Sequence, residues 1–336
     1  MILIGAVTRL TESGLSITEW KVVTGTLPPL SEEDWAAEFL KYQQSPEYIH
    51  KNQGMELSDF KKIFFWEWFH RFWGRMIGLV FIIPFFYFIS KGYFKGAFAG
   101  RLFFIFLLGG FQAFLGWWMV KSGLVDNPNV SHYRLAIHLS TALLLLLLIY
   151  WTILDIRFPR LTHLKNKFPQ AKTLFKIGFV VLCIQIIYGA FVAGRDAGQE
   201  INTWPLMDGQ WVKEGIFSSH NRPFYYNLIG EPIPDEMDPA LGFPNNGGIQ
   251  FIHRWMAFVV YIWVWILWIY GKRNNFRSDQ KRSSSWLLFF VHVQILLGIF
   301  TLLYNVPILL GALHQMVAVF LLMASLLLYH QLRGSE

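Results

Sequence analysis

Four histidines lie inside apolar stretches of the chain, and their type and placement could support metal chemistry. They are His70, His138, His253 and His314. An ionisable side chain within a membrane span is costly and usually marks a functional site. Imidazole is a common axial ligand of haem iron, and two histidines on facing helices can hold one iron between them. Arranged as two pairs, the four histidines therefore predict ligands for two haem irons.

Two other roles are possible for these histidines. A histidine in a membrane helix can also be a hydrogen-bonding contact between helices. Zinc normally takes a closed set of four ligands, and no cysteine or acidic cluster accompanies these histidines to complete such a set. We therefore favour haem iron.

The elements that must position the histidines are membrane helices. The chain has 336 residues, of which 54% are hydrophobic and 15% charged, which is typical of an all-α polytopic membrane protein. A membrane span needs about 20 apolar residues. Seven stretches meet this length, at approximately 63–89, 101–120, 134–154, 174–193, 249–270, 285–304 and 311–330. An eighth, Met1 to Val7, is too short to cross, and we interpret it as a truncated first helix of eight.

The basic residues predict the orientation of the helices. They gather in the linkers 90–101, 155–173 and 271–284, and basic linkers face the cytoplasm. With an even helix count, both termini are expected to be cytoplasmic, in a bacterial inner membrane. This topology accounts for the net charge of +7, so nucleic acid is not an expected partner. The single cysteine, Cys183, forms no intrachain disulfide.

The two halves of the chain resemble each other. They align with an offset of about 183 residues, which matches Gly5 with Gly189, Trp20 with Trp204, Gln112 with Gln294, Gly116 with Gly298 and His70 with His253. His138 and His314 then fall at corresponding places in the fourth and eighth helices. We therefore expect two pseudo-symmetric four-helix bundles, at 1–160 and 161–336. Each carries a histidine on its second and fourth helices, about 5–10 Å below the outer surface.

One position differs between the halves. Glu67 lies one helical turn before His70, on the same helix face, and the repeat places Gln250 at the equivalent position. A carboxylate can move protons or stabilise positive charge, and an amide does neither well. We therefore predict that the first half holds the reacting site and the second half a stably bound haem. The alternative is that Glu67 only pairs with Arg71 or Arg75.

His70 and His253 occupy equivalent positions in the two halves. Each is followed by an arginine, Arg71 and Arg254. A guanidinium near the membrane surface is a suitable partner for a haem propionate. The alternative is that both arginines extend outward to lipid phosphates. In the outer loops, Ser31 and Asp34 with Trp35 and Phe39 predict a capped amphipathic helix, whereas 230–248 reads as loop.

Several motifs taken together resemble heme A synthases. They include WEWFHRFWGRMIG around His70, HYRLAIHLS around His138, GRDAGQEINTWPLMDG, FIHRW around His253 and ALHQMVAV around His314. The likeness runs from end to end. Some bacterial members carry a cysteine pair in the first outer loop, and residues 9–62 contain none, so the chain is similar to the cysteine-free branch of Gram-negative bacteria and mitochondria.

The resemblance implies an oxidoreductase that oxidises the C8 methyl group of haem O to a formyl group, giving haem A for cytochrome oxidase. It implies that Glu67, His70 and His138 form the catalytic substrate site. It further implies that His253 and His314 ligate a haem B cofactor. The implied partners are haem O, a haem O synthase, an electron donor and membrane lipid, with a homo-oligomer left open.

Two other function classes are compatible with paired histidines. A dihaem b-type electron carrier also pairs histidines in bundle helices, but it normally places its haems near opposite faces of the membrane. A haem transporter or chaperone would deliver haem without chemistry. One half has a carboxylate, Glu67, where the other half has an amide, Gln250. This difference favours catalysis over both of these classes.

Overall fold

The regular secondary structure of the described residues is helical except for two short strands. The computed structural model describes residues 1–20, 24–125, 128–158, 168–217, 225–226, 232–233 and 245–333. Within these ranges, seven helices are long and apolar enough to cross a membrane: α4 (Leu57–Ser90), α5 (Gly96–Lys121), α6 (His132–Arg157), α7 (Pro169–Gly194), α8 (Asn246–Arg273), α9 (Ser278–Leu303) and α10 (Ile308–Arg333). The seven predicted spans are confirmed, and polar end turns lengthen most of them. The strands β1 (Tyr225–Tyr226) and β2 (Pro232–Ile233) pair with each other.

The chain separates into two compact units. The first comprises Met1–Leu145 with a short segment from Tyr226, and the second comprises Leu146–Tyr225 and Pro232–Glu336. The division falls within α6, so each unit is described by itself. Arg160, Lys165, Lys167 and His163 of the predicted basic linker lie outside the described residues, as does most of the predicted loop 230–248.

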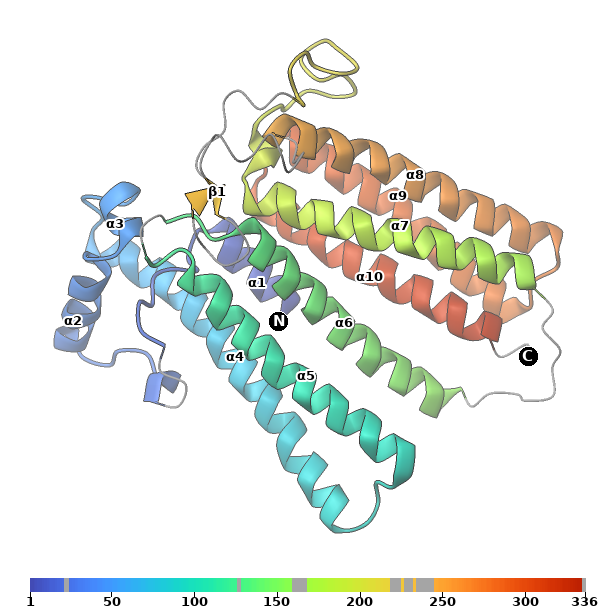
Figure 1. Cartoon of the computed structure of the whole chain (residues 1–336), viewed down its shortest axis with the longest axis horizontal. Helices are drawn as coiled ribbons and strands as arrows, with labels where there is room; N and C mark the ends of the chain where they lie inside the picture. Colours follow the sequence, from blue (N-terminus) through green and yellow to red (C-terminus); the bar gives the residue numbers. More distant parts are fainter. Residues whose placement is uncertain are drawn as a thin grey trace. The chain divides into compact units, whose positions relative to one another are not determined.

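In the first unit, α4 is the central helix. It has 34 residues, about 51 Å at 1.5 Å per residue, which exceeds the hydrocarbon thickness of about 30 Å. The short helix α1 (Ile2–Leu10) and α5 both pack on α4, as Figure 1 shows. The Thr8 hydroxyl of α1 donates a hydrogen bond to the backbone oxygen of Trp66. The extra length of α4 supports the segment that joins α1 to α4.

The segment between α1 and α4, which the sequence predicts to be an outer loop and which keeps that name here, carries η1 (Thr24–Thr26), α2 (Glu32–Tyr42) and α3 (Pro46–His50). Helix α2 begins with the predicted capping box, because the Ser31 hydroxyl accepts from the Asp34 backbone N–H and the Asp34 carboxylate accepts from the Ser31 N–H. Its apolar side packs on α4 through a buried cluster of Tyr42, Phe60 and Phe64 with Trp35 and Phe39 at its edge. The predicted amphipathic helix is confirmed.

In the second unit, α7 packs against α8 and α10, α8 against α9, and α9 against α10. Helix α7 approaches α8 closely at Gly178, where an added methyl group would collide with the Trp263 ring. The Trp263 indole N–H donates to the Leu174 backbone oxygen at 3.0 Å. At the far end of this unit His330 contacts Asp155 at 3.1 Å.

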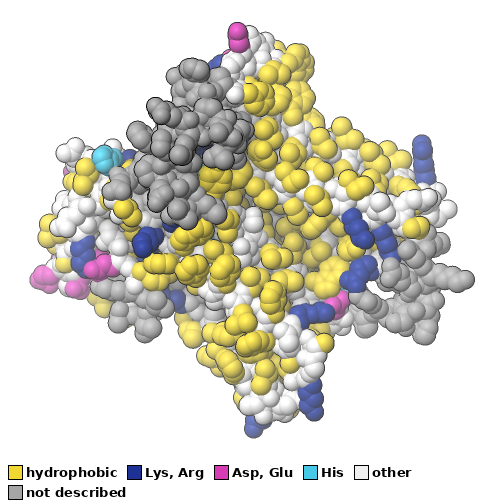
Figure 2. All heavy atoms as spheres, in the orientation of Figure 1, with side chains coloured by type: hydrophobic (Ala, Val, Ile, Leu, Met, Phe, Trp, Pro, Cys, Tyr) yellow, Lys and Arg dark blue, Asp and Glu magenta, His cyan; other side chains and the backbone are white. Residues whose placement is uncertain are grey.

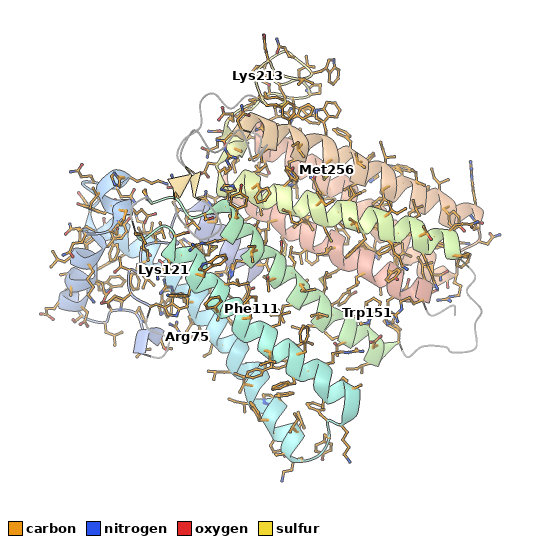
Figure 3. The ribbon with its side chains drawn as sticks, in the orientation of Figure 1. Arg75, Phe111, Lys121, Trp151, Lys213 and Met256 are labelled. Carbon is orange, nitrogen blue, oxygen red and sulfur yellow. The ribbon has the colours of Figure 1, made fainter. Side chains whose placement is uncertain are left out.

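Large apolar side chains stay exposed along the helices. Figure 2 shows hydrophobic side chains over much of the described surface of one face. Val80 on α4 is 74% exposed, Ile83 64% and Phe104 on α5 55%. Figure 3 shows side chains, including Phe111 on α5, projecting from the ribbon. Exposed apolar surface of this extent marks a membrane or partner contact, and with seven apolar helices it indicates a multi-pass membrane protein.

Candidate functional site

The second unit brings two of the predicted ligands together. His253 on α8 and His314 on α10 have ring centroids 6.4 Å apart, with their planes inclined at 75°. Both side chains are half-buried, so neighbouring side chains do not cover them fully. The Nδ1 atom of His253 is buried without a hydrogen-bond partner among the described residues.

This geometry fits a shared haem iron. A metal-bound imidazole nitrogen lies about 2 Å from its metal, which puts the ring centroid about 3 Å away, so two imidazoles on opposite sides of one iron have centroids about 6 Å apart. The observed 6.4 Å agrees with this spacing. Within the described residues, no group of three or more His, Cys, Asp or Glu side chains could hold a metal ion.

In the first unit, His70 lies on α4 and His138 on α6, both half-buried. The His70 ring faces Gly5 of α1, and the His138 ring faces Gly116 of α5. The two imidazoles are within electrostatic range of each other. The first unit thus contains both predicted histidines.

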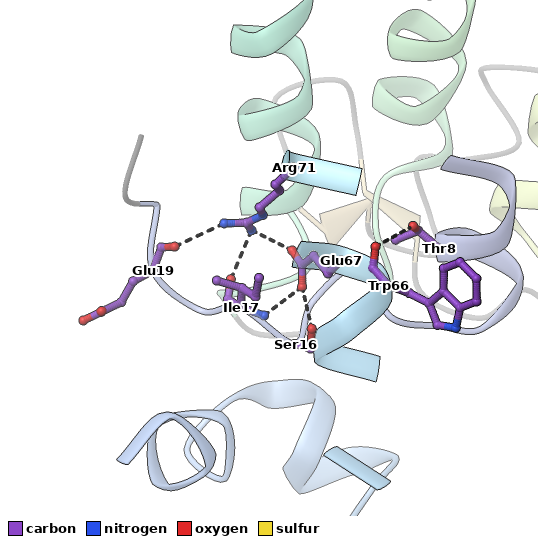
Figure 4. Close-up of polar contacts among 7 residues, drawn as sticks. All are labelled: Thr8, Ser16, Ile17, Glu19, Trp66, Glu67 and Arg71. Atoms are coloured by element: carbon purple, nitrogen blue, oxygen red, sulfur yellow. Dashed lines mark hydrogen bonds and ion pairs between the residues drawn. The ribbon is translucent and has the colours of Figure 1, made fainter. Parts of the chain in front are cut away.

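Glu67 is held in a closed set of contacts (Figure 4). Its side chain is 3% exposed. One carboxylate oxygen accepts from the Ser16 hydroxyl and from the Ile17 backbone N–H, both at 2.7 Å, and the other accepts from Arg71 at 2.6 Å. A group that faces three donors and acts only as an acceptor has the bonding pattern of an ionised carboxylate. The structure thus contains the pairing of Glu67 with Arg71 that the sequence left open as an alternative.

Arg71 attaches the outer loop to α4. It donates to the backbone oxygens of Ile17 and Glu19, each at 3.2 Å, besides its ion pair with Glu67. Its guanidinium also lies over the Trp20 ring at 4.7 Å. These contacts occupy the face of Arg71 toward the loop, and its contact with a propionate stays a prediction.

In the first unit Glu67 and Arg71 thus hold the preceding loop to the helix, an arrangement that we call a clamp. An equivalent clamp occurs in the second unit. Arg254 donates to the backbone oxygen of Thr203 at 2.6 Å and lies over the Trp204 ring at 5.3 Å. Gln250 donates to the backbone oxygen of Ile201 at 3.1 Å. These loop positions are the repeat equivalents of Glu19, Trp20 and Ile17, so the repeat read from the sequence also appears in side-chain contacts.

The two clamps differ in the charge and in the hydrogen-bond direction of the side chain one turn before the histidine. Glu67 accepts from the backbone N–H of Ile17, whereas Gln250 donates to the backbone oxygen of Ile201. The first unit therefore places a fixed negative charge one turn from His70, and the second places a neutral amide at the equivalent position. In addition, Nη1 of Arg254 is buried without a hydrogen-bond partner in the described structure. That donor is available to an anionic group such as a propionate.

Sequence reasoning missed the residues that hold this arrangement. Ser16 and Ile17 have no motif of their own, because a hydroxyl and a backbone N–H carry no spacing signal. Gln185 of α7 was also missed, although it stands four residues before Gly189, as Gln112 does before Gly116 and Gln294 before Gly298. That spacing was the available signal.

Comparison with known proteins assigns the class. The sequence profile of the cytochrome oxidase assembly protein family matches residues 1–326, and the chain belongs to this family. Among individual relatives, it is 42% identical over 335 residues to the heme A synthase of Flavobacterium johnsoniae, covering 99% of this chain and 93% of the relative. It is 43% identical to the heme A synthase of Parvibaculum lavamentivorans, over 94% and 85% of the two chains. It is 40% identical to heme A synthase COX15 of Arabidopsis thaliana, over 99% and 71%.

Proposed function

We propose that this chain is a heme A synthase that oxidises the C8 methyl group of haem O to a formyl group, supplying haem A for cytochrome oxidase. The observation that carries the proposal is the pair of imidazoles of His253 and His314, with ring centroids 6.4 Å apart, within a chain that matches its family almost from end to end. An unactivated methyl group cannot be oxidised by protein side chains alone, and bound haem iron supplies the redox chemistry.

The proposed architecture is two four-helix bundles, 1–160 and 161–336, with α1 counted as the first of eight helices. The basic linkers favour cytoplasmic termini in a bacterial inner membrane. His253 and His314 hold a resident haem B, and His70 and His138 hold the haem O substrate. Arg254 offers its free Nη1 to a propionate of the resident haem.

The proposed role of Glu67 follows from its contacts. Ser16, Ile17 and Arg71 hold the carboxylate in a fixed position. A preorganised negative charge stabilises positive charge that develops nearby during a reaction, without rearranging at that moment. Glu67 therefore stabilises positive charge on the substrate beside the methyl carbon. A proton relay is the less favoured role, since it requires one of the three donors to leave.

Co-expression with a haem O synthase in a host that makes no haem A tests this proposal. The extracted haems are identified by chromatography and mass. We expect haem A or its hydroxylated precursor with the wild-type chain. Haem O that accumulates unchanged beside protein-bound haem B would contradict an oxidase and would favour an electron carrier or a haem chaperone.

A further inference from the structure

Three of the four histidines are approached by a glutamine and a glycine from a neighbouring helix. The pairs are Gln112 with Gly116 on α5, Gln185 with Gly189 on α7, and Gln294 with Gly298 on α9. In each pair the two residues are four apart, so they lie one above the other on one helix face. They meet His138, His253 and His314 respectively.

The glycine leaves space for the imidazole ring. A methyl group added at Gly116 would lie 3.1 Å from Cε1 of His138, and one added at Gly189 or Gly298 would lie 3.0 Å from Cε1 of His253 or His314. Nonbonded carbon atoms prefer about 3.5–4.0 Å, so alanine would displace each ring by about 0.5 Å. By contrast, nothing lies within 4 Å of a methyl group added at Gly110, which is also on α5. The close approach is therefore a feature of the histidine contacts rather than of every glycine on these helices.

The glutamine amide meets the same histidine. Nε2 of Gln112 lies 3.1 and 3.4 Å from the two ring nitrogens of His138, and Nε2 of Gln294 lies 3.3 and 3.2 Å from those of His314. Since Cε1 lies between the two ring nitrogens, both amides stand at the Cε1 edge. Gln112 also donates to the backbone oxygen of His138 at 2.9 Å, and Gln185 to that of His253 at 3.0 Å.

Each glutamine keeps an unused acceptor. Oε1 of Gln112, Gln185 and Gln294 is buried without a hydrogen-bond partner among the described residues. A buried acceptor without a donor is costly, and here it recurs at three equivalent places, each beside a predicted ligand. A histidine that binds metal through Nε2 carries its proton on Nδ1 and donates that proton to an acceptor. A half-turn of the Gln294 amide exchanges its nitrogen and oxygen and brings Oε1 within reach of Nδ1 of His314.

We propose that these three glutamine–glycine pairs are positioning residues that fix the imidazole planes of His138, His253 and His314 before haem binds, and that Gln294 accepts the Nδ1 proton of His314 once iron is bound. The inference rests on the proposed function. Metal–ligand distances tolerate about 0.2 Å, so a displacement of about 0.5 Å at the ring strains the bond to iron.

The test uses the purified protein with its resident haem B. The readouts are the electron paramagnetic resonance spectrum of low-spin haem, its midpoint potential, and the rate of haem transfer to apomyoglobin. Gly298→Ala and Gln294→Leu are expected to alter the spectrum and to speed haem loss about 10- to 100-fold. Gln294→Glu keeps the acceptor, and is expected to retain haem while lowering the midpoint potential.

Controls separate a positioning role from general damage to the fold. Gly110→Ala is expected to match the wild type in all three readouts. Gly116→Ala is expected to leave the resident haem unchanged and to weaken retention of haem O. An unchanged spectrum and rate of haem loss in both Gly298→Ala and Gln294→Leu would overturn the inference while leaving the proposed function standing. A wild-type chain without low-spin haem would overturn both.

Discussion

Replacement of Glu67 by glutamine gives the first unit the residue type that the second unit has at Gln250. It therefore tests directly whether the charge of Glu67 matters. Glu67→Gln keeps the shape of the side chain but removes its charge, and it directs an amide N–H₂ at one of its former donors. The side chains of Arg71 and Glu67 are only 11% and 3% exposed. Loss of one partner of a buried ion pair costs about 3–5 kcal/mol. Arg71 retains the backbone oxygens of Ile17 and Glu19, so we expect the lower end of this range, about 3 kcal/mol.

Two assays follow from that magnitude. A change of about 3 kcal/mol alters a local opening equilibrium by about 100-fold, so hydrogen exchange at the Ile17 amide, which donates to Glu67, is expected to accelerate by up to that factor. In the haem extraction assay, Glu67→Gln is expected to keep haem B bound but to leave haem O or its alcohol unconverted. Full conversion with unchanged protection of Ile17 would refute the reasoning.

Two matched variants distinguish charge from loop anchoring. Adding Arg71→Met to Glu67→Gln removes the two remaining hydrogen bonds from Arg71 to the loop, so loop protection is expected to fall further while conversion stays blocked. Gln250→Glu makes the reverse change in the second unit, where a carboxylate would face the backbone oxygen of Ile201. We expect it to reduce conversion only as far as it reduces bound haem B. An equal loss of haem conversion in Glu67→Gln and in Gln250→Glu would contradict a special role for the first half.

Three further predictions concern stability and haem retention. Burial raises the pKa of Glu47 to about 7, so between pH 4.5 and about 7 the folded chain holds a proton that the unfolded chain has released. The free energy of unfolding of the outer loop therefore falls as pH rises through this interval, by up to about 3 kcal/mol, and hydrogen exchange should show this dependence in the wild type but not in Glu47→Gln. Gly178→Ala drives a methyl group into the Trp263 ring and is expected to lower the unfolding temperature in detergent, whereas Gly110→Ala should not; equal temperatures would contradict the packing argument. Arg254→Gln removes the free Nη1 and is expected to speed transfer of haem B to apomyoglobin roughly 10-fold, and an unchanged rate would argue against a propionate contact.

The sequence predicts the membrane helices well because each depends on a long run of apolar residues. The capping box of Ser31 and Asp34 was also predictable, because it depends on a local spacing. The repeat of the two halves was readable from glycine, tryptophan and histidine positions, and the contacts of Arg71 and Arg254 with equivalent loop residues agree with it.

The clamps themselves were not predictable in detail. Arg71 has three plausible partners in sequence, namely a propionate, a lipid phosphate and Glu67, and only the path of the loop decides which is within reach. The loop is attached through the backbone groups of Ile17, which leave no trace in the residue types. Likewise, Gln185 in an apolar helix is compatible with any helix contact until its distance to His253 is known.

The most direct test of the account is to identify which haem each histidine pair retains. Single alanine variants of His70, His138, His253 and His314 would be purified from a host that makes both haem B and haem O, and their haems extracted and identified. We predict that His253→Ala and His314→Ala lose haem B, whereas His70→Ala and His138→Ala keep haem B, fail to retain haem O and form no haem A. Loss of haem B from the His70 or His138 variants, with retention in the His253 and His314 variants, would contradict the assignment of the two sites.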